Sequence, residues 1–143
     1  MKRLLKTLIT MVLALSIVFC AVPVRSYAAV DQAKQVKKLV KYIRKISINN
    51  ENWTMTTKSK KTKKGYDVTI TGITNQLSRA DVIDLSVKGD PNYKKIIDSI
   101  SGTSKELYKR GKKTYKLKKT NVFFVWKTYD GYTVVTVKNG IVQ

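Results

Sequence analysis

The strongest indication of the fold is the stretch VFFVWKTYDGYTVVTVK, residues 122–138. Its two halves are dense in β-branched and aromatic residues, which favour strands. Between them, Asp130-Gly131 is a pair that favours a two-residue hairpin turn, because glycine tolerates the positive φ that such turns need. The stretch therefore predicts two adjacent antiparallel strands, Val122–Tyr129 and Tyr132–Lys138, whose apolar face other elements must cover.

Alternation of side-chain character predicts three more strands upstream. Tyr115 and Leu117 alternate with lysines just before the stretch above. Residues 53–57 and 66–71 also alternate with a period of two, which is typical of half-buried strands joined in a hairpin. The sequence thus predicts a roughly five-stranded antiparallel sheet.

An amphipathic helix is predicted over Asp31–Ile46, where apolar residues recur at spacings of three and four among lysines and arginines. Asp31 is well placed to be its N-cap. Its apolar stripe could dock on the sheet or lie on an anionic membrane, as in antimicrobial helices. We favour docking, because the sheet needs a cover.

A second helical region is expected between the two groups of strands. Ser78 and Asp81 have the spacing of a capping box, which predicts a short helix. Asp90-Pro91 predicts a further helix, with an acidic cap and a proline in its first turn, and Gly102 is expected to end it. A last short helical turn is expected before the strands resume.

These elements define an α+β fold, with an N-terminal helix and a central helical segment packed on the antiparallel sheet. In element order alone, the outline is similar to cystatin-like and nuclear-transport-factor-like folds.

A secretory signal peptide is predicted at residues 1–28. Three of the first six residues are basic, and residues 8–22 carry no charge and are mostly apolar. This pattern is typical of a signal peptide, and the apolar run is shorter than the ~20 residues of a spanning helix. Small residues at Ser26 and Ala28 predict cleavage after Ala28, with Ala29 as second choice. The remaining residues, 29–143, are expected to form a single basic domain.

Two other uses of this segment are disfavoured. An uncleaved membrane anchor would not need the small residues of a cleavage site. Lipid attachment at Cys20 would need a small residue before the cysteine, and Phe19 stands there. Cys20 is therefore interpreted as part of the apolar run.

Charge dominates the predicted domain. Cleavage would leave 25 basic and 9 acidic residues, a formal charge of +16, and 22 of the basic residues are lysines. Lysine is a hydrated point charge, whereas arginine reads guanine edges through its planar fork. The composition therefore favours diffuse attraction to a polyanion over sequence-specific nucleic-acid binding. Codon bias in an AT-rich genome would produce the same lysine content without a functional cause.

The domain contains neither cysteine nor histidine. This excludes disulfides, zinc sites of the Cys/His type, and catalysis by thiols or imidazoles. No cofactor or metal site is expected. Carboxylates could still serve a small hydrolase, but no pattern pairs the candidates across a cleft, so a non-enzymatic protein is expected. The candidate acids are Asp81, Asp84, Asp98 and Glu106. An exported domain without disulfides favours a bacterial source.

Two lysine-rich segments are the candidate polyanion-binding residues. They are Lys58, Lys60, Lys61, Lys63 and Lys64 at the first hairpin, and Lys109, Arg110, Lys112, Lys113, Lys116, Lys118 and Lys119 before the last strands. Aromatic residues lie among the second group, which raises the possibility of base stacking. Strand alternation, however, predicts that about half of these rings are in the core.

We therefore expect a secreted, non-enzymatic binding protein, retained at the cell wall by an anionic polymer or surface. Candidates are teichoic acid, anionic lipid and extracellular nucleic acid. One alternative is a secreted effector, either an antimicrobial protein or an inhibitor of another protein. The second is the small carboxylate-based hydrolase. The sequence does not predict an oligomeric state.

Overall fold

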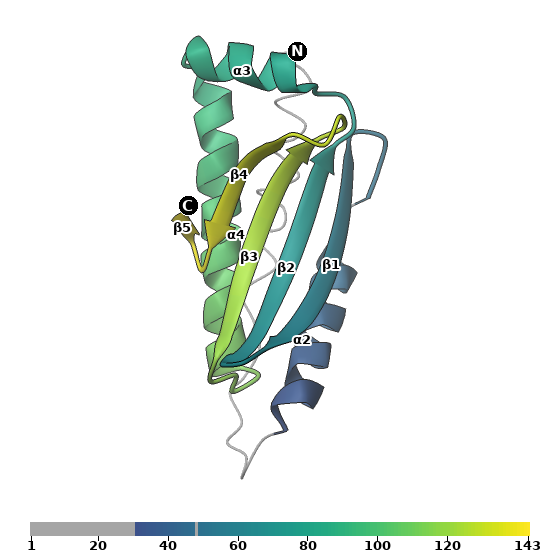
Figure 1. Ribbon diagram of the computed structural model, residues 1–143, viewed down its shortest axis with the longest axis vertical. Coiled ribbons are helices and arrows are strands. Elements are labelled where there is room, and N and C mark those ends of the chain that lie inside the picture. The colour runs from purple at the N-terminus through teal and green to yellow at the C-terminus, as the bar shows by residue number, and fades with distance from the viewer. Residues whose placement is uncertain (1–30, 48) are drawn as a thin grey trace.

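The computed structural model describes residues 31–47 and 49–143 (Figure 1). The predicted signal peptide at 1–28, with its cleavage sites, lies outside the described residues. The elements are α2 (Gln32–Ile46), β1 (Trp53–Thr62), β2 (Gly65–Thr74), α3 (Arg79–Val87), α4 (Pro91–Lys113), β3 (Thr120–Thr128), β4 (Thr133–Lys138) and β5 (Ile141–Val142). Within the described ranges, no helix combines the length and the apolar character needed to cross a membrane.

The five strands form one mixed sheet in the order β1-β2-β3-β4-β5. Three neighbouring pairs are antiparallel, but β2 and β3 at the centre are parallel. The α+β class is confirmed, whereas the expectation of an antiparallel sheet is wrong at its centre. The reason is the long crossover through α3 and α4, which returns the chain to the end of the sheet where β2 begins.

The helix starts follow the capping signals in the sequence. The Asp31 carboxylate accepts hydrogen bonds from two backbone N–H groups in the first turn of α2. Ser78 and Asp81 form a reciprocal capping box at α3, and Asp90 caps α4 with Pro91 in the first turn. All of these predicted caps are confirmed, and each satisfies backbone donors that would otherwise lack a partner.

Helix α4 does not end at Gly102 as expected. It continues as one helix of 23 residues to Lys113, so the separate last turn is also wrong. Beyond Gly102 the helix still packs on the sheet: Thr103 and Ser104 are fully buried, and the Ser104 hydroxyl donates to the Val122 carbonyl at 3.1 Å. These contacts offset the roughly 0.5–1 kcal/mol that a glycine costs inside a helix.

The strand expected at Tyr115–Leu117 is absent. Residues 114–119 form a loop, and the fifth strand of the sheet is instead the two-residue β5. Lys116 has a φ of 55°, which is incompatible with an extended strand, and Leu117 is 3% exposed beside Gly111 of α4. The alternation in this segment therefore reflects one buried leucine in a lysine-rich loop.

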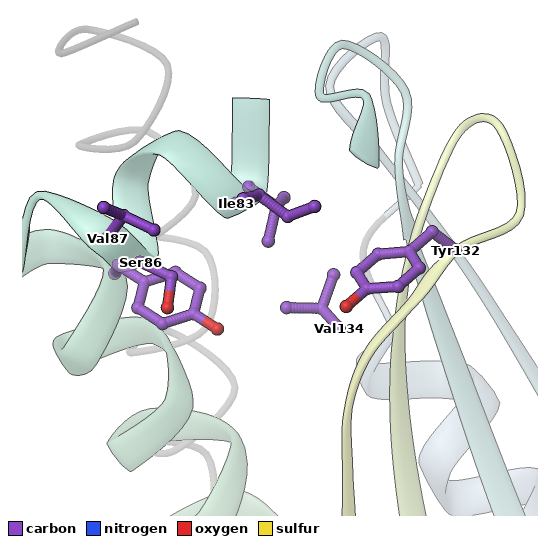
Figure 2. Close-up of a pocket in the computed structure, with 7 residues that line it drawn as sticks. Ile83, Ser86, Val87, Tyr132 and Val134 are labelled. Atoms are coloured by element: carbon purple, nitrogen blue, oxygen red, sulfur yellow. The ribbon is translucent and has the colours of Figure 1, made fainter. Parts of the chain in front are cut away.

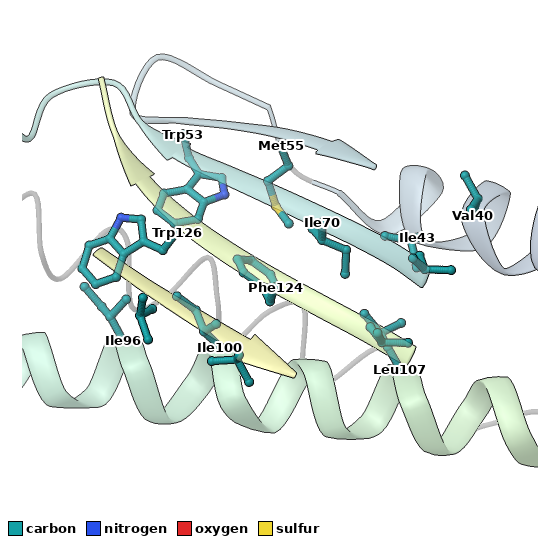
Figure 3. Close-up of a cluster of buried hydrophobic side chains, with 14 of the residues drawn as sticks. Val40, Ile43, Trp53, Met55, Ile70, Ile96, Ile100, Leu107, Phe124 and Trp126 are labelled. Atoms are coloured by element: carbon teal, nitrogen blue, oxygen red, sulfur yellow. The ribbon is translucent and has the colours of Figure 1, made fainter. Parts of the chain in front are cut away.

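The core lies between the sheet and the helices α2 and α4, which pack on the same face (Figures 1 and 3). Phe124 and Trp126 of β3 are fully buried at its centre, and Trp53 of β1 lies 6.5 Å from Trp126 between ring centroids. The other face of the sheet, which we call the open face, is covered by no helix among the described elements.

Candidate polyanion-binding surface

The two lysine-rich segments meet at one end of the molecule, the lower end in Figure 1. The hairpin turn between β1 and β2 lies against the loop before β3, because β2 and β3 start side by side. The backbone N–H of Tyr66 donates to the carbonyl of Lys119 at 2.9 Å. A Cβ added at Gly65 would overlap that carbonyl oxygen, so glycine permits the close approach. We call this lysine-rich region, residues 58–64 and 109–119, the basic end.

Helix α2 fixes the loop of the basic end from the other side. The Gln32 side chain donates to the Lys116 carbonyl at 3.1 Å and accepts from the Lys118 backbone N–H at 3.0 Å. These two hydrogen bonds also place the first turn of α2, with the exposed Lys34, at the same end of the fold. Sequence reasoning missed both residues, since nothing local links Gln32 to a loop more than 80 positions away.

Most of the predicted site residues are exposed. Three of the hairpin lysines belong to the end of β1 and two form its turn, so the hairpin is longer than expected. The exposed residues are Lys58, Lys60, Lys61, Lys63, Lys64, Lys109, Lys112, Lys113, Lys118 and Lys119. Only Arg110 and Lys116 are half-buried. None of the five hairpin lysines forms an ion pair with another described residue.

Three cationic side chains of the basic end contact other side chains of the fold. The Arg110 guanidinium lies 4.1 Å from the ring centroid of Tyr42, and burial raises the pKa of the Tyr42 phenol. The neutral ring and the cation thus form a half-buried cation–π pair. Lys109 forms an ion pair with Glu106 at 2.9 Å, and the Lys112 ammonium lies 4.6 Å from the Tyr108 ring centroid. Arg110 is therefore less available to a ligand than its neighbours.

Positive charge is concentrated at the basic end. The 18 residues of the basic end carry 12 positive charges and no acid. Of the flanking acids, Asp67 accepts a hydrogen bond from Asn121, Glu106 pairs with Lys109, and Asp31 caps the first turn of α2. Four of the nine acids, Asp81, Asp84, Asp90 and Asp130, belong to α3, the start of α4 and the β3–β4 turn. Such a concentration of one sign attracts anions strongly at low salt.

The aromatic residues near the lysines do not form an exposed stacking surface. The rings at the basic end itself are half-buried and pack against the core; they are Tyr66, Tyr108 and Tyr115. Phe124 and Trp126 are fully buried in the core, and Tyr129 and Tyr132 lie at the far end of β3 and β4. On the open face, the Lys138 ammonium lies 5.6 Å from the ring centroid of Phe123 and covers that ring. Binding of single-stranded nucleic acid usually places successive bases on exposed rings. The basic end instead presents point charges.

Each candidate catalytic carboxylate has a local structural partner. Hydrogen bonds from the hydroxyl and backbone N–H of Ser78 lower the pKa of Asp81, which caps α3. Each of the other three carboxylates forms an ion pair with a nearby lysine. The pairs are Asp84 with Lys88, Asp98 with Lys94, and Glu106 with Lys109. The described residues contain no group of acids arranged to hold a metal ion. The carboxylates thus have the roles of caps and surface ion pairs.

No family model, curated protein or solved structure matches the chain. The outline similarity to cystatin-like and nuclear-transport-factor-like folds therefore stays a prediction.

Proposed function

We propose that this protein is a secreted, non-enzymatic binding protein that attaches to an anionic polymer or surface of a bacterial cell envelope through its basic end. The observation that carries the proposal is the meeting of two lysine-rich segments, about 50 residues apart in the chain, with no acid in either. Folding concentrates their charge on one end, where a single polyanion can contact both.

Among the candidate ligands, the side-chain chemistry favours a polymer of phosphodiesters without bases, such as teichoic acid. Eleven of the 12 cations at the basic end are lysines, and the one arginine packs on Tyr42. Lysines neutralise phosphates without demanding a fixed geometry. The lack of neighbouring exposed rings counts against nucleic acid, and anionic lipid remains the competing surface.

The antimicrobial alternative receives less support from the packing of α2. Its apolar residues Val36, Leu39 and Ile43 are at most 2% exposed, because they face the sheet. A membrane would have to displace this helix from the core before it could bind the apolar stripe.

The proposal can be tested by measuring binding of residues 29–143 to purified teichoic acid, anionic vesicles and single-stranded DNA over a salt series. For phosphate contacts, the logarithm of the binding constant falls linearly with the logarithm of salt concentration. We expect a steep negative slope and the tightest binding to teichoic acid. Binding that does not change with salt, or no binding to any of the three, would refute the proposal.

A matched pair of double variants locates the contact. Lys63→Gln/Lys64→Gln removes two adjacent exposed lysines from the hairpin turn. Lys94→Gln/Lys95→Gln removes two adjacent exposed lysines from the first turns of α4, away from the basic end. The hairpin variant should reduce the salt slope by about 0.7–0.9 for each lost phosphate contact, while the control changes it little. If both double variants reduce the salt slope equally, binding depends on the total charge of the protein and not on the basic end.

A further inference from the structure

Helix α2 presents exposed lysines along one side. Its buried residues face the sheet, and five lysines lie on the opposite side of the helix. At 3.6 residues per turn, all five fall within an arc of about 100°. They are Lys34, Lys37, Lys38, Lys41 and Lys45. We call them the α2 lysine row.

The α2 lysine row has no acidic partner in its own helix. Residues 32–46 contain no aspartate or glutamate, and none of the five lysines forms an ion pair with another described residue. Helix α4 differs, because Asp98 and Glu106 each pair with a lysine of the same helix. Like charges three or four residues apart destabilise a helix. The row therefore retains a repulsion that a bound polyanion would relieve.

The acids around α2 do not cancel this charge. Asp31 caps the first turn of α2, and Glu106 is engaged in its ion pair within α4. Asp67 of β2 is on the open face, and Glu51 lies in the loop that follows the helix. With Arg44, α2 carries six cations, which outnumber these four acids. Charge complementarity thus favours an anionic ligand.

The α2 lysine row continues the positive surface of the basic end. Gln32, in the first turn of α2, is hydrogen bonded to the backbone of the loop at residues 116 and 118. From this end α2 runs alongside β1 (Figure 1). At 1.5 Å per residue, the helix extends about 16 Å from Lys34 to Lys45. A polymer bound at the basic end can therefore continue along α2.

We propose that the α2 lysine row binds a second stretch of the same anionic polymer that the basic end binds. The inference rests on the proposed function, and the ligand it names is a flexible phosphate polymer, not a membrane. Lys58 and Lys60 of β1 lie on the open face, because their positions alternate with the buried residues of this strand. Helix α2 packs on the other face. A flat bilayer would meet one face at a time, whereas a flexible polymer can pass around the end of the sheet and gain affinity from both contacts.

The opposite end of the fold offers no comparable surface. Figure 2 shows a small groove there between α3 and the β3–β4 turn, lined in part by Ile83, Val87 and Tyr132. Cations and acids are similar in number around it, and Lys88 and Lys94 are each engaged in an ion pair. This end is therefore suited to a control variant.

The test measures the salt dependence of binding to purified teichoic acid for residues 29–143 and three double variants. Lys37→Gln/Lys41→Gln removes two lysines from the row, and Lys37→Arg/Lys41→Arg keeps their charge. Lys94→Gln/Lys95→Gln removes equal charge from α4, near the groove. Glutamine, arginine and lysine have similar helix propensities, so all three variants should fold as the original does. We expect only the first variant to reduce the salt slope, by about 0.7–0.9 for each lost phosphate contact.

The hairpin variant Lys63→Gln/Lys64→Gln separates this inference from the proposed function. If the hairpin variant reduces the slope and Lys37→Gln/Lys41→Gln does not, the row is not a binding surface, while the basic end remains one. If the original protein does not bind teichoic acid, both proposals fail.

Three further results would overturn the inference alone. The first is an equal loss in Lys94→Gln/Lys95→Gln, because total charge would then explain the effect. The second is an equal loss in Lys37→Arg/Lys41→Arg, because charge would then not be the cause. The third is that Lys37→Gln/Lys41→Gln weakens binding to anionic vesicles but not to teichoic acid, because the row would then contact a membrane.

Discussion

The backbone N–H of Tyr66 donates a hydrogen bond of 2.9 Å to the carbonyl of Lys119, and this contact joins the two halves of the basic end. It begins the parallel pairing of β2 and β3, which continues from Tyr66 and Thr120 to Thr74 and Thr128. The parallel pairing of β2 with β3 therefore also brings the two lysine-rich segments together.

The first prediction concerns the glycine beside this contact. In Gly65→Ala, the new Cβ would overlap the Lys119 carbonyl oxygen, so the start of β2 must move away from β3. We expect a loss of about 1–3 kcal/mol in the free energy of unfolding, the usual cost of overpacking. Urea denaturation measures it, and a variant as stable as the original would contradict the close approach.

Gly102→Ala is the control for that variant. Gly102 is exposed inside α4, and a Cβ there would meet no atom within 4 Å. Alanine should therefore stabilise the protein by about 0.5–1 kcal/mol through its better helix propensity. If the two substitutions change the free energy of unfolding in opposite directions, crowding at Gly65 is responsible, and not a general effect of replacing glycine.

A second prediction concerns stability in acid. Hydrogen bonds from Ser78 lower the pKa of Asp81 below its ordinary 3.8, and those from the Thr128 hydroxyl and the Arg79 backbone N–H lower the pKa of Asp130. The unfolded chain then binds protons at a higher pH than the folded chain does. Stability should be intact at pH 7 and fall as the pH drops through about 4 toward the lower folded pKa values.

Denaturation at a series of pH values checks this dependence. Asp81→Asn/Asp130→Asn should flatten the loss of stability between about pH 5 and pH 3, because both carboxyls are removed. At neutral pH, Ser78→Ala should cost about 1 kcal/mol through loss of the α3 cap. If the double variant loses as much stability in acid as the original protein does, other carboxyls cause the loss.

A third prediction separates packing from charge within the basic end. Arg110→Gln removes the cation that lies 4.1 Å from the Tyr42 ring centroid, which should cost about 0.5–2 kcal/mol of stability. Lys119→Gln removes an exposed charge and should change stability by no more than about 0.5 kcal/mol. Polyanion affinity should fall with Lys119→Gln at least as much as with Arg110→Gln. A stable Arg110→Gln variant would mean that Arg110 does not support the fold.

Local patterns in the sequence were sufficient for the helix starts and for most strands. The caps at Asp31, Ser78 and Asp90 depend on neighbouring backbone groups. The strand predicted at Val122–Tyr129 from its β-branched and aromatic residues is β3, with bounds shifted by one or two residues. Errors arose where distant contacts decide the structure. Helix α4 passes Gly102 because Ser104 and Leu107 pack on the sheet, and the parallel β2–β3 pairing depends on the whole crossover.

The same distinction applies to the candidate sites. Lysine density is a local property, so both segments of the basic end could be found in the sequence. Their meeting depends on the register of Tyr66 with Thr120, which no local pattern encodes. The exposure of Ile83 was not predicted, because the spacing of Ser78 and Asp81 indicates a short helix but not which of its side chains face outward. Only the packing of Val82 and Leu85 reveals that Ile83 faces outward.

The last prediction uses the two tryptophans as reporters of the core. Trp53 is 1% exposed and Trp126 is fully buried, and the chain has no other tryptophan. Native emission should therefore be blue-shifted, weakly quenched by acrylamide, and shifted to the red only on unfolding. In Gly72→Ala, the new Cβ would overlap the Trp53 indole, which should cost about 1–3 kcal/mol and raise quenching in the folded state. Thr71→Ala, on the open face one position away, should leave native emission unchanged, and identical quenching in both variants would contradict the packing of Trp53 on β2.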